Sequence, residues 1–314
     1  MTNRIQRFIA FLLILCIPIF AIAGCTNNDV ANAANQVTTN ANGTYSIDTK
    51  TTTPEGKLDV YMLDIGQGDA ILLKVGDEYS MIDTGDIEHR ENIVAQLKTM
   101  GVTKLKNIII THPHADHMGG FYAIAKAMPI EHVYDDGIAV DNNMYKTYEK
   151  WIEKNKIQRT TLRNGDVVDF GHGAVFVVYA PWVEPLTDKK GETDLNNNSI
   201  VGKLIFGKFS MLFTGDAEWQ EEKKLIKEQN SRLFARILKV GHHGSRTSSS
   251  EDFLKSIKPE SALISNGMYN KYGHPHDVTL RRLQENNIAI YRTDTMGRIH
   301  ISTDGNKWQI TTER

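Results

Sequence analysis

Residues 111–120 read THPHADHMGG. This stretch places three imidazoles and one carboxylate, His112, His114, Asp116 and His117, within six residues of a chain that has only 11 histidines. The apolar run 108–110 precedes it, and a Gly-Gly pair and a helix-like stretch at 121–128 follow. This order predicts a buried strand, a ligand-bearing loop and a helix. Imidazole nitrogen and carboxylate oxygen suit zinc, and also manganese or iron, so the segment predicts a metal site.

The spacing within this stretch predicts two ions. His112 and His114 are two residues apart, so on extended backbone both can point to one side and bind one ion. Asp116 and His117 come after the turn and can bind a second ion nearby.

The motif resembles that of the metallo-β-lactamase superfamily, whose HxHxDH loop holds a binuclear metal centre. Further segments are similar to one branch of it, the soluble hydrolase domains of the DNA-uptake competence protein ComEC and its free-standing relatives. These segments are LDIGQGDA (63–70), MIDTG (81–85), NNNSIV (196–201), FTGDAE (213–218), KVGHHGS (239–245) and YGHPH (272–276). The resemblance extends from about Leu58 to the C-terminus. It implies an α/β fold, the αββα sandwich, with two mixed sheets face to face and helices outside, and two zinc ions, with manganese as the alternative.

The N-terminus carries signals of export. Arg4 and Arg7 precede an apolar stretch at 8–20, which is typical of a secretory signal peptide. Residues 22–25, IAGC, resemble a bacterial lipobox, which implies that Cys25 becomes lipidated after cleavage. We therefore expect a signal peptide at 1–24 and a protein that is exported and anchored by lipid to the outer face of the cell membrane. The only other cysteine, Cys16, would leave with the signal, so no disulfide is expected.

Two segments follow the signal. Residues 25–56 are rich in Asn, Thr and Ala and nearly free of large apolar side chains, which predicts a disordered tether. Residues 57–314 are long enough for one large hydrolase domain.

The charge balance excludes one class of protein. The chain has 36 basic and 38 acidic side chains, and removing Arg4 and Arg7 with the signal leaves 34 against 38. A protein that holds nucleic acid by broad counterion release has a basic surface. Any nucleic acid must therefore be bound locally, near the metals.

Strand-like and helix-like runs alternate along the domain. Periodicity alone indicates only a mixed α/β domain, with hairpin turns at 76–77 and 207–208. The expected strands are 58–62, 70–75, 79–82, 108–110, 174–179, 199–206, 209–213, 237–239, 262–265, 289–291 and 298–302, and the expected helices are 91–100, 145–155, 220–228, 251–257 and 278–286.

The remaining ligands come from the later segments. The resemblance implies that Asp216 bridges both metals, and its alternative role is to cap the helix that begins near residue 218. We assign His242 as the last ligand of the metal held by Asp116 and His117. His243 is the alternative, because adjacent extended residues cannot point the same way. His274 competes for the same position, but we favour it as a pocket residue that contacts a substrate oxyanion or protonates the leaving group.

One feature departs from many members of the superfamily. They have another histidine before the bridging aspartate, where this chain has 196-NNNS-199. The first metal would then keep only His112, His114 and Asp216, with room for water or substrate, so a single metal or a preference for manganese is the alternative. We assign substrate binding to Asn198, Ser199, Ser245 and Lys271, and catalysis to Asp116 and His274. Asp83 is expected to orient a metal-bound imidazole.

The function expected is metal-dependent hydrolysis by activated water. The branch resemblance implies a phosphodiester substrate, in DNA or a related polymer. The alternatives are an enzyme acting on another extracellular ester, such as a phosphocholine ester or a lactone, and a surface lipoprotein that binds metal without turnover. A β-lactamase is disfavoured because the third histidine is absent.

Overall fold

The larger sheet joins the two ends of the domain. In this computed structural model, which describes residues 37–39, 45–47 and 54–314, eight strands lie in the order β17-β16-β3-β4-β5-β6-β7-β8. Near the C-terminus, β16 pairs antiparallel with β3, whereas β5, β6, β7 and β8 run parallel. The strands are β3 (Leu58–Met62), β4 (Ala70–Val75), β5 (Glu78–Thr84), β6 (Leu105–Ile109), β7 (Ile130–Asp135), β8 (Gln158–Thr161), β16 (Ile299–Thr303) and β17 (Trp308–Thr312).

The smaller sheet has seven strands in the order β15-β14-β13-β12-β11-β10-β9. Strands β9 to β12 form an antiparallel meander, and β12 to β15 are parallel. The strands are β9 (Val167–Gly171), β10 (Ala174–Ala180), β11 (Val201–Phe206), β12 (Phe209–Phe213), β13 (Ile237–Lys239), β14 (Ser261–Ile264) and β15 (Ala289–Arg292).

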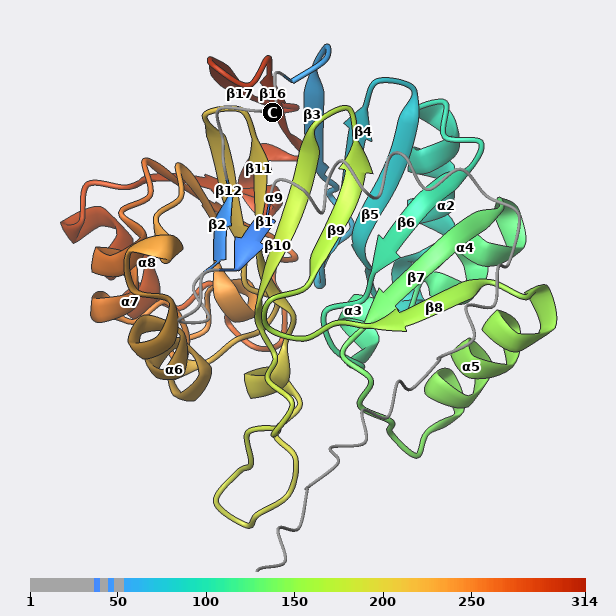
Figure 1. Cartoon of the computed structure of the whole chain (residues 1–314), viewed down its shortest axis with the longest axis horizontal. Helices are drawn as coiled ribbons and strands as arrows, with labels where there is room; N and C mark the ends of the chain where they lie inside the picture. Colours follow the sequence, from blue (N-terminus) through green and yellow to red (C-terminus); the bar gives the residue numbers. More distant parts are fainter. Residues whose placement is uncertain (1–36, 40–44, 48–53) are drawn as a thin grey trace, which may run out of the picture.

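Helices cover the outer face of each sheet (Figure 1). The larger sheet carries α2 (Arg90–Thr99), α4 (Phe121–Ala127) and α5 (Asn143–Asn155), and the smaller sheet carries α6 (Trp219–Gln229), α7 (Glu251–Ile257) and α8 (Asp277–Glu285). Shorter helices are α3 (Ala115–Met118), α9 (Thr293–Met296), η1 (Ile87–His89), η2 (Asn196–Asn198), η3 (Asn230–Leu233) and η4 (Gly241–Gly244).

Three apolar clusters correspond to these layers. One lies between the sheets and includes Val60, Phe176 and Phe213. The second packs the larger sheet against its helices, and the third does the same for the smaller sheet. A sheet buried on both faces requires apolar residues throughout, and all seven residues of β10 are buried. The αββα sandwich expected from the sequence is therefore confirmed.

The predicted elements mostly agree with the structure, and both hairpin turns are confirmed. Four strands, β7, β8, β9 and β17, were not predicted from the sequence. These strands lack a continuous apolar run, and every position of the edge strand β8 is exposed or half-buried. A period-2 signal is weak in strands that are so short and so polar.

The N-terminal predictions fall largely outside the described residues. The signal peptide and Cys25 lie there, so both stay predictions. Within the segment expected to be a disordered tether, β1 (Val37–Thr39) pairs antiparallel with β2 (Tyr45–Ile47), and the tether stays a prediction. In the described part of the chain, no helix has the length and apolar character needed to cross a membrane.

Candidate metal centre

The site lies where strands of both sheets end. One side of each sheet is parallel, β5 to β8 in the larger and β12 to β15 in the smaller, and the carboxyl ends of parallel strands meet at one edge, where α/β proteins place their ligands. The histidine-rich loop follows β6, Asp216 follows β12, and the two adjacent histidines follow β13. Figure 1 shows α3, which carries Asp116 and His117, just below the centre of the view between the two halves of the molecule.

The loop after β6 brings its ligands together as the sequence predicted. The Nε2 atom of His112 lies 3.0 Å from Nδ1 of His114, so the two imidazoles face one point. His112 and His117 are fully buried, and Asp116 is partly exposed at the pocket.

Asp216 lies at the centre of the cluster. Its Oδ1 is 3.1 Å from Nε2 of His117, and its Oδ2 is 3.9 Å from Nε2 of His112. One carboxylate thus lies between the groups expected to hold the first and the second ion. The capping alternative gains no support, because α6 begins at Trp219 with no side-chain hydrogen bond at its N-cap.

The two adjacent histidines do not have the extended backbone that was expected from the sequence. His242 and His243 are not extended, because both have left-handed backbone with φ of 48° and 53°. The Nε2 atoms of both rings therefore approach Asp216 Oδ2, at 3.7 Å and 3.6 Å. Only His243 also reaches Asp116 Oδ2, at 3.2 Å.

Four ligand atoms form the tightest group. One atom from each of Asp116, His117, Asp216 and His243 lies within 4.8 Å of all the others. His243 thus occupies the position that the sequence analysis gave to His242. Its Nδ1 donates to the carbonyl oxygen of Ser265 at 2.9 Å, and this hydrogen bond fixes the ring. His242 lies beside the group, with Nδ1 3.0 Å from Glu218.

Buried polar residues hold the ligands in place. Asp83 accepts from the Thr111 backbone at 2.7 Å and lies 2.7 Å from Nδ1 of His117, so it orients this imidazole as expected. Asp69 is ion-paired with Lys239, and both side chains are buried. Lys239 was not among the predicted site residues, although a lysine at the end of an apolar strand is an unusual signal.

A close backbone approach completes the arrangement. Gly68 packs so near to α3 that a Cβ there would lie 2.5 Å from the carbonyl oxygen of Asp116. The backbone N–H of Asp69 donates to that oxygen at 3.0 Å. The loop before β4 therefore positions the ligand-bearing helix.

The electrostatics favour a bound cation. Burial alone would lower the pKa of His243, but Asp216, Asp116 and Asp69 raise it to about 10. Burial likewise opposes charge on His117, yet Asp216 and Asp83 hold its pKa well above the usual value. The carboxylates thus attract positive charge into a buried site.

Unpaired atoms test whether a metal fits. Nε2 of His117, Oδ1 of Asp216 and Nε2 of His243 are buried and have no hydrogen-bond partner. Buried polar atoms are nearly always satisfied, and these converge within one group of nitrogen and oxygen donors. The donor set therefore fits a divalent cation such as zinc or manganese.

The pocket over the ligands has a volume of about 350 Å³. Besides the ligands, its lining includes Gln67, Asn196, Tyr272 and His274. Burial, and then the neighbouring His243 and His242, lower the pKa of His274 to about 4. A neutral imidazole can donate one hydrogen bond or bind a metal, but it is a poor store for the proton that the predicted general acid must deliver.

Three of the predicted substrate-binding residues do not line this pocket. Asn198 uses its amide to hold the backbone of Leu186 and Asp194. Ser199 is fully buried, and its hydroxyl accepts from the backbone N–H of Asp216 at 3.0 Å. Ser245 is buried and bonded to Thr247.

The predicted role of Asn198, Ser199 and Ser245 in substrate binding gains no support from these contacts. Each side chain is occupied by neighbouring protein atoms, so it supports the site instead of contacting substrate. Asn196 takes the place of Asn198 on the pocket wall. Lys271 adjoins Tyr272 at the pocket rim and stays a candidate.

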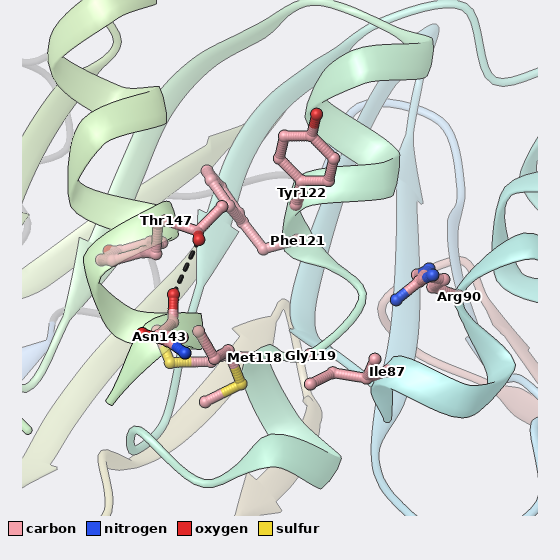
Figure 2. Close-up of a pocket in the computed structure, with 10 residues that line it drawn as sticks. Ile87, Arg90, Met118, Gly119, Phe121, Tyr122, Asn143 and Thr147 are labelled. Atoms are coloured by element: carbon pink, nitrogen blue, oxygen red, sulfur yellow. Dashed lines mark hydrogen bonds between the residues drawn. The ribbon is translucent and has the colours of Figure 1, made fainter. Parts of the chain in front are cut away.

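A second hollow lies behind the ligand-bearing helix. Figure 2 shows this cavity, of about 230 Å³, lined by Ile87, Met118, Phe121 and Tyr122 with Arg90 at its side. Among the described residues that line it there is no histidine or carboxylate. The candidate metal ligands therefore lie at the first pocket and not at this hollow.

Comparison with known proteins agrees with this geometry. The family model of the metallo-beta-lactamase superfamily matches residues 63–267, and the chain belongs to this superfamily. The chain is 30% identical over 245 residues to Competence protein ComA of Neisseria gonorrhoeae, covering 78% of this chain and 32% of that protein. It is also 30% identical over 264 residues to ComE operon protein 3 of Bacillus subtilis, covering 78% and 33%. The chain thus spans about a third of the length of these relatives.

A solved structure supports the fold. The metallo-beta-lactamase fold protein YhfI from Bacillus subtilis superposes with a TM-score of 0.54 at 12% identity, covering 78% of this chain and all of that one. At this identity the likeness concerns the fold alone.

Proposed function

We propose that the protein is a metal-dependent hydrolase that cleaves a phosphodiester, in DNA or a related polymer. One observation carries the proposal. Buried carboxylate and imidazole atoms that lack hydrogen-bond partners converge beneath an open pocket, in a superfamily fold made up mostly of metal-dependent hydrolases.

The ligands divide between two zinc ions, with manganese as the alternative. Asp116, His117 and His243 would hold one ion, and His112 and His114 the other, with Asp216 shared. A bound divalent cation lowers the pKa of water from about 15.7 to near 7 and polarises a phosphoryl oxygen.

The other pocket residues orient the reaction. Asp83 and Asp69 keep the imidazoles in place, and Asn196 and Gln67 offer amide groups at the wall. His274 lies over the ligands as a neutral ring and can donate a hydrogen bond to a substrate oxygen. Lys271, at the rim, supplies a positive charge for a phosphate.

Similarity in sequence favours a phosphodiester over the other esters. The two relatives described above are named as a competence protein and a ComE operon protein, and each match covers 78% of this chain. A phosphocholine ester or a lactone is the alternative substrate. A metal-binding protein without turnover is the alternative of another class.

The decisive experiment compares metals and substrates. The purified protein, stripped by chelator and reloaded with Zn²⁺ or Mn²⁺, is assayed on an oligonucleotide, bis-p-nitrophenyl phosphate, p-nitrophenyl phosphocholine and a lactone. We expect metal-dependent cleavage of the oligonucleotide and of bis-p-nitrophenyl phosphate. The Asp216→Ala variant should cleave neither. Preferred turnover of the choline ester or the lactone would identify the alternative enzyme, and no turnover with full metal would identify a binding protein.

The cellular location is proposed from the N-terminal sequence. The IAGC stretch at 22–25 would place a lipid on Cys25 and anchor the protein outside the cell membrane. In extracts of expressing cells, the Cys25→Ser variant should then no longer partition into the detergent phase. If this variant loses its signal peptide and still partitions as wild type does, the lipid anchor is refuted.

A further inference from the structure

An aromatic loop borders the metal pocket. The segment between β14 and α8 contains Tyr269, which is 97% exposed, and Tyr272, which is 50% exposed. Exposing large rings sacrifices the burial free energy that they offer. Exposed aromatics next to a reactive pocket therefore indicate a binding surface.

The loop is held rigidly. The side chain of Asn270 accepts from the backbone N–H groups of Tyr272 and His274 and donates to the carbonyl oxygen of Gly267. At its start, a Cβ on Gly267 would lie 2.7 Å from the backbone nitrogen of Gln67, which lines the pocket. Tyr269 follows Gly267 by two residues, so its Cα lies within about 7 Å of that anchor.

A column of rings leads outward from the ligands. The rings of His243 and His274 stack with centroids 6.2 Å apart, and Tyr272 stacks on His274 at 5.6 Å. The Nζ atom of Lys271 lies 5.1 Å from the centroid of Tyr272. Aromatic faces and a flexible cation thus alternate beside the pocket.

We propose that Tyr269 and Tyr272 form a stacking platform for unpaired bases, with Lys271 on the intervening phosphate, so that the enzyme prefers single-stranded nucleic acid. This inference rests on the proposed phosphodiesterase function and adds the residues that select the substrate. Base stacking on aromatic side chains combined with basic contacts is how single strands are bound without sequence preference. A duplex keeps its bases stacked inside and offers none to these rings.

A choline headgroup fits the same loop less well. Quaternary ammonium recognition uses a cage of several rings around the cation. The Lys271 ammonium already lies over Tyr272, and within the described residues no other aromatic ring packs against Tyr269.

The test uses the metal-loaded full chain with Tyr269→Ala, Tyr272→Ala and Tyr272→Phe. Tyr122→Ala on α4 is the matched control, because Tyr122 is exposed but lines the hollow of Figure 2. The substrates are a single-stranded oligonucleotide, the same sequence as a duplex, and an abasic strand of equal length. Melting temperatures verify that each variant is folded.

Removing either tyrosine ring should reduce the preference of the enzyme for the intact single strand over the abasic strand. We expect wild type to favour the single strand over the abasic strand, mainly through KM. The measured quantity is the kcat/KM on the intact single strand divided by the kcat/KM on the abasic strand. Each Tyr→Ala change should reduce this ratio by roughly 5- to 100-fold. Tyr272→Phe and Tyr122→Ala should keep it.

Each other outcome rejects a defined claim. Equal losses on the intact and abasic strands, or no loss, would overturn the platform while leaving the phosphodiesterase intact. If wild type cleaves none of the strands with Zn²⁺ or Mn²⁺, the proposed function itself fails and the platform with it.

Discussion

The two halves of the sandwich contribute to the metal centre in different ways. The larger-sheet half supplies His112, His114, Asp116 and His117 from one stretch of six residues that follows one strand. The smaller-sheet half supplies its groups from separate segments after β12, β13 and β14. One half encodes its ligands locally, whereas the other assembles them through the parallel order of its strands.

The supporting residues follow the same division. His117 is held by Asp83, which ends the neighbouring strand of the same sheet. His243 and Asp116 instead meet across the interface of the two halves. The Lys239–Asp69 ion pair also crosses this interface, because β13 belongs to the smaller sheet and Asp69 precedes β4 of the larger.

The largest effect is expected at the shared carboxylate. Asp216→Ala should abolish turnover and remove more metal than Asp116→Ala, because Asp216 faces ligands of both ions. Metal content is measured by mass spectrometry, and Asp216→Asn, which keeps the shape, controls for folding. Full metal content and rate in Asp216→Ala would break the idea that the two halves share one carboxylate.

The adjacent histidines provide the next test. His243→Ala should lose the ion shared with Asp116, and His242→Ala should retain it, because only His243 reaches both carboxylates. His274→Ala should also keep the metal, since His274 lies outside the tight group. Metal titration of the three variants decides the assignment, and the reverse result would make His242 the ligand.

Removing the buried cation tests the interface between the halves. Lys239→Met removes the nearest cation from the buried Asp69 and leaves only the imidazoles, with His243 Nδ1 3.5 Å from its Oδ1, so we expect a loss of up to roughly 3–5 kcal/mol in unfolding free energy. Urea denaturation with chelator present excludes any contribution from metal. The exposed pair Lys104–Glu131 is the control, and Lys104→Met should leave the unfolding free energy nearly unchanged because solvent screens this pair. Similar costs for both variants would show that the buried pair does not stabilise the interface.

The smallest effect concerns orientation within one half. Asp83→Asn should weaken metal binding by roughly 10- to 100-fold through His117, with the fold retained. Asp59→Asn is the matched control. Asp59 Oδ1 lies 2.7 Å from Nε2 of His300, the same separation as in the Asp83–His117 pair, but this contact is outside the metal site. Equal metal affinity in the two variants would mean that Asp83 does not position the imidazole.

Much of the fold was predictable because its strands are buried. The runs 58–62, 70–75 and 209–213 match their strands residue for residue. Strands β8 and β17 were missed because they lie at a sheet edge with few buried residues, and such strands owe their structure to a partner strand more than to their own pattern.

The site shows the same limit. Asp83 as an orienting residue and the convergence of His112 with His114 were predictable, because each follows from a strand and the residues beside it. Asn198 and Ser199 were misplaced, because the sequence does not reveal that their polar atoms are already bonded within the loop and to Asp216.

By itself the sequence determined the superfamily, the buried strands and the ligand-bearing loop, because these depend on residues that are close along the chain. Tertiary structure alone decided that His243 meets Asp116, that Lys239 neutralises Asp69, and that Tyr272 borders the pocket. The reason is geometric. Two left-handed residues in η4 redirect a pair of side chains, and parallel strands of two sheets end at one edge, so residues more than 100 positions apart come within a few ångströms.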